Sequence, residues 1–148
     1  MKVSIELDPF MDEPEILIRA PQLTEEIAWL QESIFKQKLV PLAFYKDRSE
    51  YFLDLETILF FETDGEKIYG YTRDEAYEVK QKLYELEELL PVAFCRISKS
   101  TIVNVKQIYS LEKSFSGTST VNFYQTHKQV HVSRRYYPVL KERLNEMR

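Results

Sequence analysis

Two adjacent arginines, Arg134 and Arg135, have the position and the chemistry to bind a polyanion. They follow a run at residues 129–132 that is predicted to be a strand. A guanidinium that projects from the end of a strand can bind the O6 and N7 atoms of guanine in a bidentate pair. The alternative is a solvated pair that caps the final helix. The two residues alone leave both interpretations open.

A second candidate is Ser98-Lys99-Ser100, where one long cation stands between two hydroxyl groups. This arrangement suits one base contact flanked by phosphate contacts. Ser100 could contact a phosphate or cap a short helix, and the sequence favours neither role. Arg96 lies on the preceding predicted strand, where it could clamp a phosphate or form a structural ion pair.

The charge is unevenly distributed along the chain, although the net charge is only −4. Residues 1–40 hold 4 Lys and Arg against 8 Asp and Glu, and residues 41–90 hold 6 against 13. Residues 91–148 hold 10 against 3. Because phosphates attract clustered cations, this basic block predicts a polyanion-binding face. The alternative is that the basic face pairs with the acidic part of the same chain.

Residues that could support catalysis or metal binding are few. His127 and His131 are four residues apart in a strand-like segment, which separates them by about 13 Å and makes them poor joint metal ligands. Cys95 lies in an apolar predicted strand, which favours a core thiol over a nucleophile. No glycine-rich phosphate loop occurs. We therefore expect a protein that is not an enzyme and has no metal, cofactor or small-molecule substrate.

The composition, with 44% hydrophobic and 30% charged residues, predicts a soluble globular protein. Acidic residues at positions 6 and 8 interrupt the apolar segment that a secretory signal would need. No stretch approaches the roughly 18 apolar residues of a membrane span. The single cysteine cannot form an internal disulfide. These features together predict a cytoplasmic location.

The elements that position these residues fall into two predicted parts. Residues 1–40 are predicted to form a β-β-α segment, with strands at 3–7 and 15–19 and a helix from Thr24 to residue 36 or 37. This segment is too small to fold alone, so we expect it to serve association or regulation. Residues 41–148 are predicted to form the binding domain.

That domain is predicted to be mainly β with short helices. A helix is expected at residues 80–89, a turn or short helix at 100–103, and a basic helix from residue 134 or 136 to 146. Strands are expected at 42–46, 51–53, 58–62, 67–72, 76–79, 93–97, 107–113, 118–124 and 129–132.

Four of these segments together resemble the LytTR DNA-binding domain family. They are Ile-Leu-Phe-Phe-Glu at 58–62, the strand and helix at 77–91, the run around Arg-Ile-Ser-Lys-Ser at 94–104, and Val-Ser-Arg-Arg-Tyr at 132–136. Each is weak alone, but their order and spacing match the family over about residues 42–144.

The resemblance implies an elongated β fold that inserts loops into successive major grooves of double-stranded DNA. Members of the family commonly bind direct repeats in promoters as two protomers, so a homodimer is expected at least on DNA. Many bacterial members are response regulators with a phosphoreceiver domain, but 40 residues cannot hold one. The sequence therefore resembles the free-standing regulators, which are often encoded beside a small membrane protein that could regulate this one.

The resemblance also places the contacting residues. It implies Lys67, Lys99 and Arg135 as base readers, with Arg96, Ser100 and Arg134 as supporting contacts. Asp64 and Glu66 in the same loop depart from a basic contact loop, because their carboxylates would repel the phosphates near Lys67. Asn104 matches the family motif and is expected to bond the backbone of its own turn. The alternative function is a protein-interaction module that uses the acidic, aromatic N-terminal half and binds no DNA.

Overall fold

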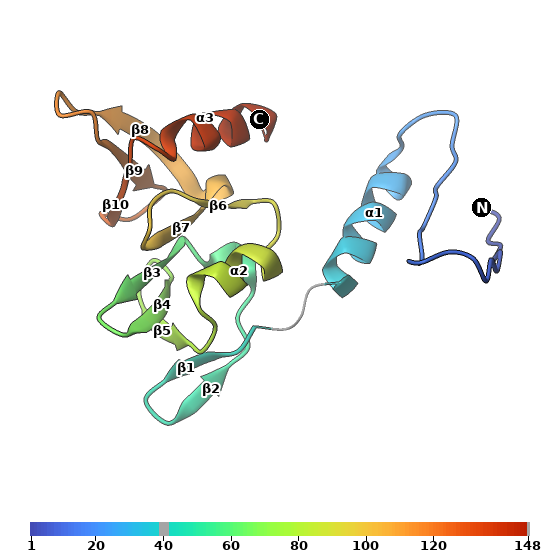
Figure 1. The fold of residues 1–148 in the computed structure, drawn as a ribbon, viewed down its shortest axis with the longest axis horizontal. Coiled ribbons are helices and arrows are strands. Elements are labelled where there is room, and N and C mark those ends of the chain that lie inside the picture. Colours follow the sequence, from blue (N-terminus) through green and yellow to red (C-terminus); the bar gives the residue numbers. More distant parts are fainter. Residues whose placement is uncertain (39–41, 148) are drawn as a thin grey trace. The chain divides into compact units, whose positions relative to one another are not determined.

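The computed structural model describes residues 1–38 and 42–147 (Figure 1). The chain divides into two units, residues 1–38 and 39–148, and each is described by itself.

The first unit contains one helix, α1 (Glu25–Lys38). The Thr24 hydroxyl accepts a hydrogen bond from the backbone N–H of Ile27 at 3.3 Å, so the predicted N-cap is confirmed. The two strands predicted at 3–7 and 15–19 are wrong, since residues 1–24 contain no strand. A two-stranded hairpin is marginal in water unless it packs on something else.

The second unit is built on a seven-stranded antiparallel sheet in the order β2-β1-β5-β4-β3-β7-β6. A helix, α2 (Leu83–Leu89), lies between β5 and β6 in the chain. The strands are β1 (Phe44–Lys46), β2 (Ser49–Tyr51), β3 (Phe60–Asp64), β4 (Lys67–Tyr71), β5 (Ala76–Val79), β6 (Phe94–Arg96) and β7 (Thr101–Asn104).

A smaller antiparallel sheet, in the order β10-β9-β8, follows in the chain. It consists of β8 (Ile108–Lys113), β9 (Ser119–Phe123) and β10 (Gln129–Val132), and the helix α3 (Tyr137–Glu146) ends the chain. Short 3-10 helices precede β3 at Leu55–Thr57 and β8 at Val105–Gln107. The predicted mainly β fold is thus confirmed for this unit.

The neighbouring strands β3 and β7 of the large sheet carry apolar side chains that are buried on both faces. Phe61 and Ile102 pack with Leu86 of α2 in one core, whereas their neighbours Phe60 and Val103 pack in another core with the small sheet and α3. Because side chains alternate along a strand, a strand covered on both faces must be apolar throughout. This explains the uninterrupted apolar run that precedes Glu62, and it produces the layers seen in Figure 1.

Two boundaries differ from the prediction for identifiable reasons. Residues 101–104 form β7 and not a turn or short helix, because Thr101, Ile102 and Val103 are β-branched and alternate between buried faces. The helix predicted from residue 80 begins at Leu83, where the Glu85 carboxylate accepts a hydrogen bond from the backbone N–H of Lys82 at 3.2 Å.

Asn104 has the structural role predicted for it. Its side-chain amide donates to the carbonyl of Ile58 at 2.9 Å, and its side-chain oxygen accepts from the backbone N–H of Lys106 at 3.2 Å. The residue is only 2% exposed, so water cannot replace these partners.

We expect Asn104→Ala to lower the free energy of unfolding by about 1 to 2 kcal/mol, because it leaves a buried carbonyl without its donor. Urea denaturation followed by circular dichroism measures this loss. Asn122→Ala is the matched control, since Asn122 is only partly buried and bonds the side chains of Ser110 and Glu112. Equal losses in the two variants would contradict the role given to Asn104.

Candidate nucleic-acid interface

The three predicted contact segments lie side by side in the second unit. The end of β3, which leads into the hairpin loop before Lys67, is bonded to the loop between β6 and β7, because the backbone N–H of Thr63 donates to the carbonyl of Ser100 at 3.0 Å. That loop is bonded in turn to the segment after β10, because the N–H of Ser133 donates to the carbonyl of Ile97 at 2.9 Å. The fold therefore brings together residues that are up to 70 positions apart (Figure 1).

Arg134 and Arg135 are adjacent but differ in their contacts. Arg134 donates to the carbonyl of Ser116 in the β8–β9 loop, so this loop holds its guanidinium. Arg135 is exposed, and its guanidinium carbon lies 5.9 Å from the ring centroid of Tyr136. Arg135 is thus the better placed of the two to reach outward to a base.

Arg96 shapes the loop between β6 and β7. Its guanidinium donates to the carbonyl of Ser98 at 2.8 Å, to the carbonyl of Lys99, and to the carboxylate of Glu87 on α2 at 3.1 Å. The side chain is only 20% exposed. The ion-pair alternative left open by the sequence is therefore present, and a phosphate contact by Arg96 stays a prediction.

Lys99 and Ser100 occupy the loop that Arg96 holds. The Lys99 side chain is exposed, as a base reader requires. The Ser100 hydroxyl is partly buried and lies 3.3 Å from the Ser98 hydroxyl and 3.4 Å from that of Thr101. This hydroxyl cluster closes the loop, and the loop leads into β7 and not into a helix that Ser100 could cap.

Lys67 lies at the start of β4, directly after a two-residue hairpin loop. Asp64 pairs with Lys67, and Gly65 takes a positive φ of 64°, which confirms the predicted turn. The Lys67 ammonium is 3.7 Å from the carboxylate of Glu78 on the neighbouring strand, and the Lys67 side chain is 61% exposed. A phosphate would have to compete with three nearby acids, so this remains the weakest of the predicted contacts.

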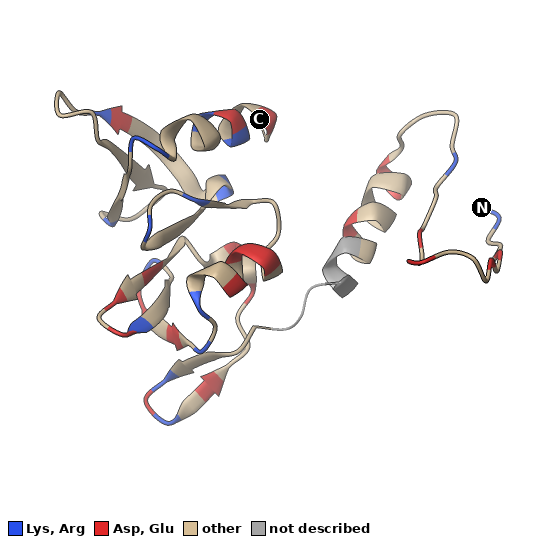
Figure 2. Cartoon of the chain, in the orientation of Figure 1, with Lys and Arg blue, Asp and Glu red and all other residues tan. Residues whose placement is uncertain are grey.

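Acidic side chains gather on α2, whereas other acids of this unit pair with lysines, as Glu75 does with Lys46 and Glu78 with Lys67 and Lys80. Figure 2 shows a continuous acidic stretch on α2, the helix that carries Glu85, Glu87 and Glu88. The loops after β6 and β10 carry Lys99, Arg134 and Arg135 instead. The alternative that the basic block pairs with the acidic part is realised at Arg96 and Glu87.

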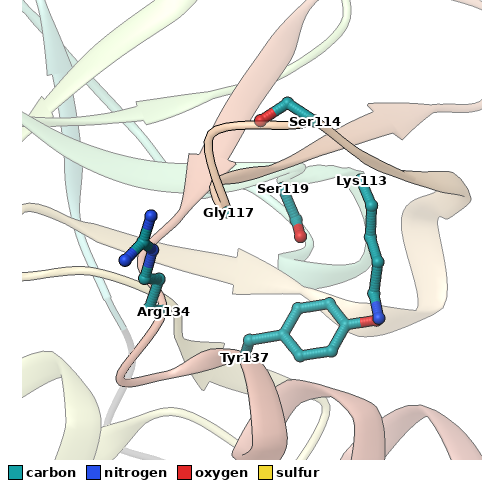
Figure 3. Close-up of a pocket in the computed structure, with 6 residues that line it drawn as sticks. All are labelled: Lys113, Ser114, Gly117, Ser119, Arg134 and Tyr137. Atoms are coloured by element: carbon teal, nitrogen blue, oxygen red, sulfur yellow. The ribbon is translucent and has the colours of Figure 1, made fainter.

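The sequence interpretation missed Lys113 and Ser119 of the small sheet. These two residues line a shallow pocket together with Ser114, Gly117, Arg134 and Tyr137 (Figure 3). The signal was available in the alternation of β9, because Ser119 occupies the same face as the buried Val121 and Phe123. The polar Ser119 on a core face, paired with Lys113 on β8, therefore indicates that the apolar core ends at this end of the small sheet.

Cys95 is a core thiol, as predicted. It is 2% exposed, and burial raises its pKa although the nearby Arg143 lowers it. The described residues contain no cluster of three or more His, Cys, Asp or Glu side chains able to hold a metal ion. None of the helices in residues 1–38 and 42–147 has the length and apolar character to cross a membrane.

Comparison with known protein families matches residues 48–145 to the LytTr DNA-binding domain. The chain belongs to this family. The matched residues include all three contact segments and extend from the β1–β2 turn to the last turn of α3. The resemblance predicted from four short motifs is confirmed.

Relatives of this LytTR protein extend over nearly its whole length. An uncharacterized HTH-type transcriptional regulator of Staphylococcus aureus strain bovine RF122 is 30% identical over 146 residues, which cover 98% of this chain and 99% of the relative. A protein of the same description from strain MRSA252 is 28% identical, again over 98% and 99%. The match therefore includes the N-terminal unit as well as the LytTR domain.

A solved LytTr DNA-binding domain, from a putative methyl-accepting/DNA response regulator of Bacillus cereus, has the same fold. Its TM-score is 0.65 at 23% identity, and the match covers 71% of this chain and 97% of that chain. Despite the HTH designation of the relatives, no two α-helices follow one another directly in residues 1–38 and 42–147, because strands separate each pair.

Proposed function

We propose that this LytTR protein is a sequence-specific transcriptional regulator that reads promoter DNA with loops placed in the major groove. The observation that carries the proposal is the pair of backbone hydrogen bonds that join the three contact segments into one surface. The major groove, about 12 Å wide, admits a β-ribbon as readily as a helix. A hairpin loop such as the one after β3 has that form.

The six predicted contacts divide into two roles in this proposal. Lys67, Lys99 and Arg135 are exposed at three successive segments and would read bases. The supporting contacts are those of Arg96, Ser100 and Arg134, whose side chains are bonded within or between the loops. The bonds of these side chains would fix the geometry of the loops, and the loops would then present Lys67, Lys99 and Arg135 to the DNA.

Two protomers on a direct repeat, in the cytoplasm, complete the proposal. Each protomer would occupy one half-site, and the repeat would set the spacing between them.

A gel-shift assay of genomic fragments over a salt series tests the proposed DNA-binding function. Specific complexes whose affinity falls steeply with salt are expected, because phosphate binding releases counterions. Binding to protein partners without any salt-dependent DNA complex would favour the protein-interaction module instead.

We expect Arg96→Lys to relax base preference at the position read by the β6–β7 loop and to weaken specific binding by about 0.5 to 1.5 kcal/mol. A lysine keeps the charge, but its single ammonium cannot hold two carbonyls and the Glu87 carboxylate in one fork. Titration against operators with single-base changes measures the effect.

Glu87→Gln is the control for that experiment, since it weakens only one of the three Arg96 contacts and leaves both carbonyl bonds in place. Its base preference should stay close to that of the original protein. If Arg96→Lys also retains full preference and affinity, the fork geometry of Arg96 is not required, and a lysine at this position is sufficient. That result would favour the phosphate clamp.

A further inference from the structure

A shallow pocket lies at one end of the small sheet, between the β8–β9 loop and the start of α3 (Figure 3). Its volume is about 240 Å³. Six residues line it: Lys113, Ser114, Gly117, Ser119, Arg134 and Tyr137. Two of them are cations, three carry hydroxyl groups, and none is a carboxylate.

The strand register brings Lys113 and Ser119 onto the core-facing side of the sheet. Lys113 pairs with Ser119, and Ser119 pairs with Val132 on the other side, so the three side chains project from the same face. Val132 is buried in the core, and so is Val121, two residues further along β9. At this level of the sheet a lysine and a serine replace the apolar residues that the face carries elsewhere.

Arg134 approaches the same space from the opposite side (Figure 3). It lies so close to Gly117 that a Cβ atom there would be 2.4 Å from the Arg134 Nε. Gly117 also has a φ of 87°, which L side chains rarely adopt. The glycine thus leaves room for the guanidinium against the loop, where it donates to the carbonyl of Ser116.

Lys113 is held by an aromatic ring and not by an acid lining the pocket. Its ammonium lies 4.9 Å from the ring centroid of Tyr137, the first residue of α3. Figure 3 shows Ser119 between Lys113 and Arg134. Both cations are exposed, so an anion carried by a large molecule can reach them.

We propose that this pocket is an anion site that receives a phosphate group through Lys113 and Arg134, with Ser119 as a hydroxyl donor. Two cations and a hydroxyl are the groups that bind a phosphate by charge-assisted hydrogen bonds. The inference rests on the proposed function where the phosphate belongs to the DNA backbone, beside the base read by Arg135. A free phosphate compound has the same chemistry, and the experiment distinguishes these two sources.

The DNA arm compares Lys113→Gln with Lys106→Gln in the full chain. Both variants lose one positive charge, but only Lys113 lines the pocket. Lys106 lies before the start of β8, and Lys113 is at the far end of that strand, about 17 Å along it. If DNA supplies the phosphate, Lys113→Gln reduces the slope of log affinity against log salt by about 0.9 and weakens all sequences alike. Lys106→Gln leaves the slope unchanged. A thermal melt of each variant confirms that it is folded.

The second arm titrates inorganic phosphate into the full chain without DNA and follows the backbone amides of Ser114, Gly117 and Ser119 by NMR. Saturable shifts that disappear in Lys113→Gln support the anion site. If these shifts occur while the DNA salt slope is unchanged, the site takes a free phosphate and the DNA source is excluded. An unchanged slope together with no saturable shift overturns the proposal. If the unmodified protein forms no salt-dependent DNA complex, the proposed function fails. The phosphate titration alone then tests whether the pocket binds an anion.

Discussion

Arg135→Ala is expected to weaken specific DNA binding by about 1 to 3 kcal/mol and to relax the preference at one base pair in each half-site. Arg135 is exposed beside Tyr136, two residues before α3 begins, and its guanidinium has the fork geometry that binds two acceptors of guanine. The fold should be unaffected, since an exposed loop side chain contributes little to stability.

Arg134→Ala is the internal comparison for Arg135→Ala, because the two residues are adjacent and carry the same charge. The β8–β9 loop holds Arg134 because its guanidinium donates a hydrogen bond to the Ser116 carbonyl. Its loss should weaken binding to all sequences alike and reduce the salt slope by roughly one unit if it contacts a phosphate. Lys99→Ala should change the preference at a different base pair from Arg135→Ala.

Titration of each variant against single-base operator changes at two salt concentrations separates these patterns. A thermal melt of the same samples excludes unfolding as the cause. If Arg135→Ala keeps full affinity and an unchanged base preference, the arginine is only a charge at the start of the final helix. The base-reading residue would then have to be sought among Lys99 and the other exposed side chains of these loops.

Most of the LytTR fold could be predicted from the sequence because strand signals are local. Alternating or continuous apolar runs located β3 to β6 and β8 to β10 to within a few residues, and Asp64-Gly65 located the hairpin turn. The β1–β2 turn was not placed, since Asp47 takes a positive φ of 54° without a glycine to indicate it. The strand predicted at 42–46 begins two residues later, at Phe44, and the strand predicted at 51–53 lies two residues earlier, at Ser49–Tyr51.

The contacts within the site could not be predicted, because they depend on which loops the fold brings together. Arg96 and Arg134 have the same charge as Arg135 in the sequence, yet both are bonded to carbonyls of their own or a neighbouring loop. Nothing local to Lys113 indicated that Arg134, 21 positions later, lies across the same pocket. The motifs identify the loops, whereas the contacts of each side chain are visible only in the tertiary structure.

The N-terminal unit leaves apolar side chains exposed, and this suggests an association role. Val3, Ile5 and Leu7 are 88%, 86% and 89% exposed, and Trp29 on α1 is 66% exposed. Both cores of the LytTR domain consist of residues beyond 41, so that domain does not need the N-terminal unit to bury its own apolar surface. We propose that residues 1–38 associate with a second copy of the chain or with a regulatory membrane protein.

Deletion of residues 1–38 is expected to remove self-association while leaving recognition of a single half-site intact. Affinity for a two-site operator should then fall by about 10²-fold or more, because the two half-sites would no longer be bound by linked protomers. Leu30→Glu should have the same direction of effect, because Ile27, Leu30 and Ile34 have the helical spacing that forms one apolar stripe on α1. Ser33→Glu adds the same charge off that stripe and is the matched control. Light scattering gives the mass in solution, and anisotropy titration gives the affinities for one and two half-sites.

If the truncated protein keeps its oligomeric state and loses half-site recognition, residues 1–38 belong to the DNA-reading surface. The division between association and DNA reading proposed here would then be wrong.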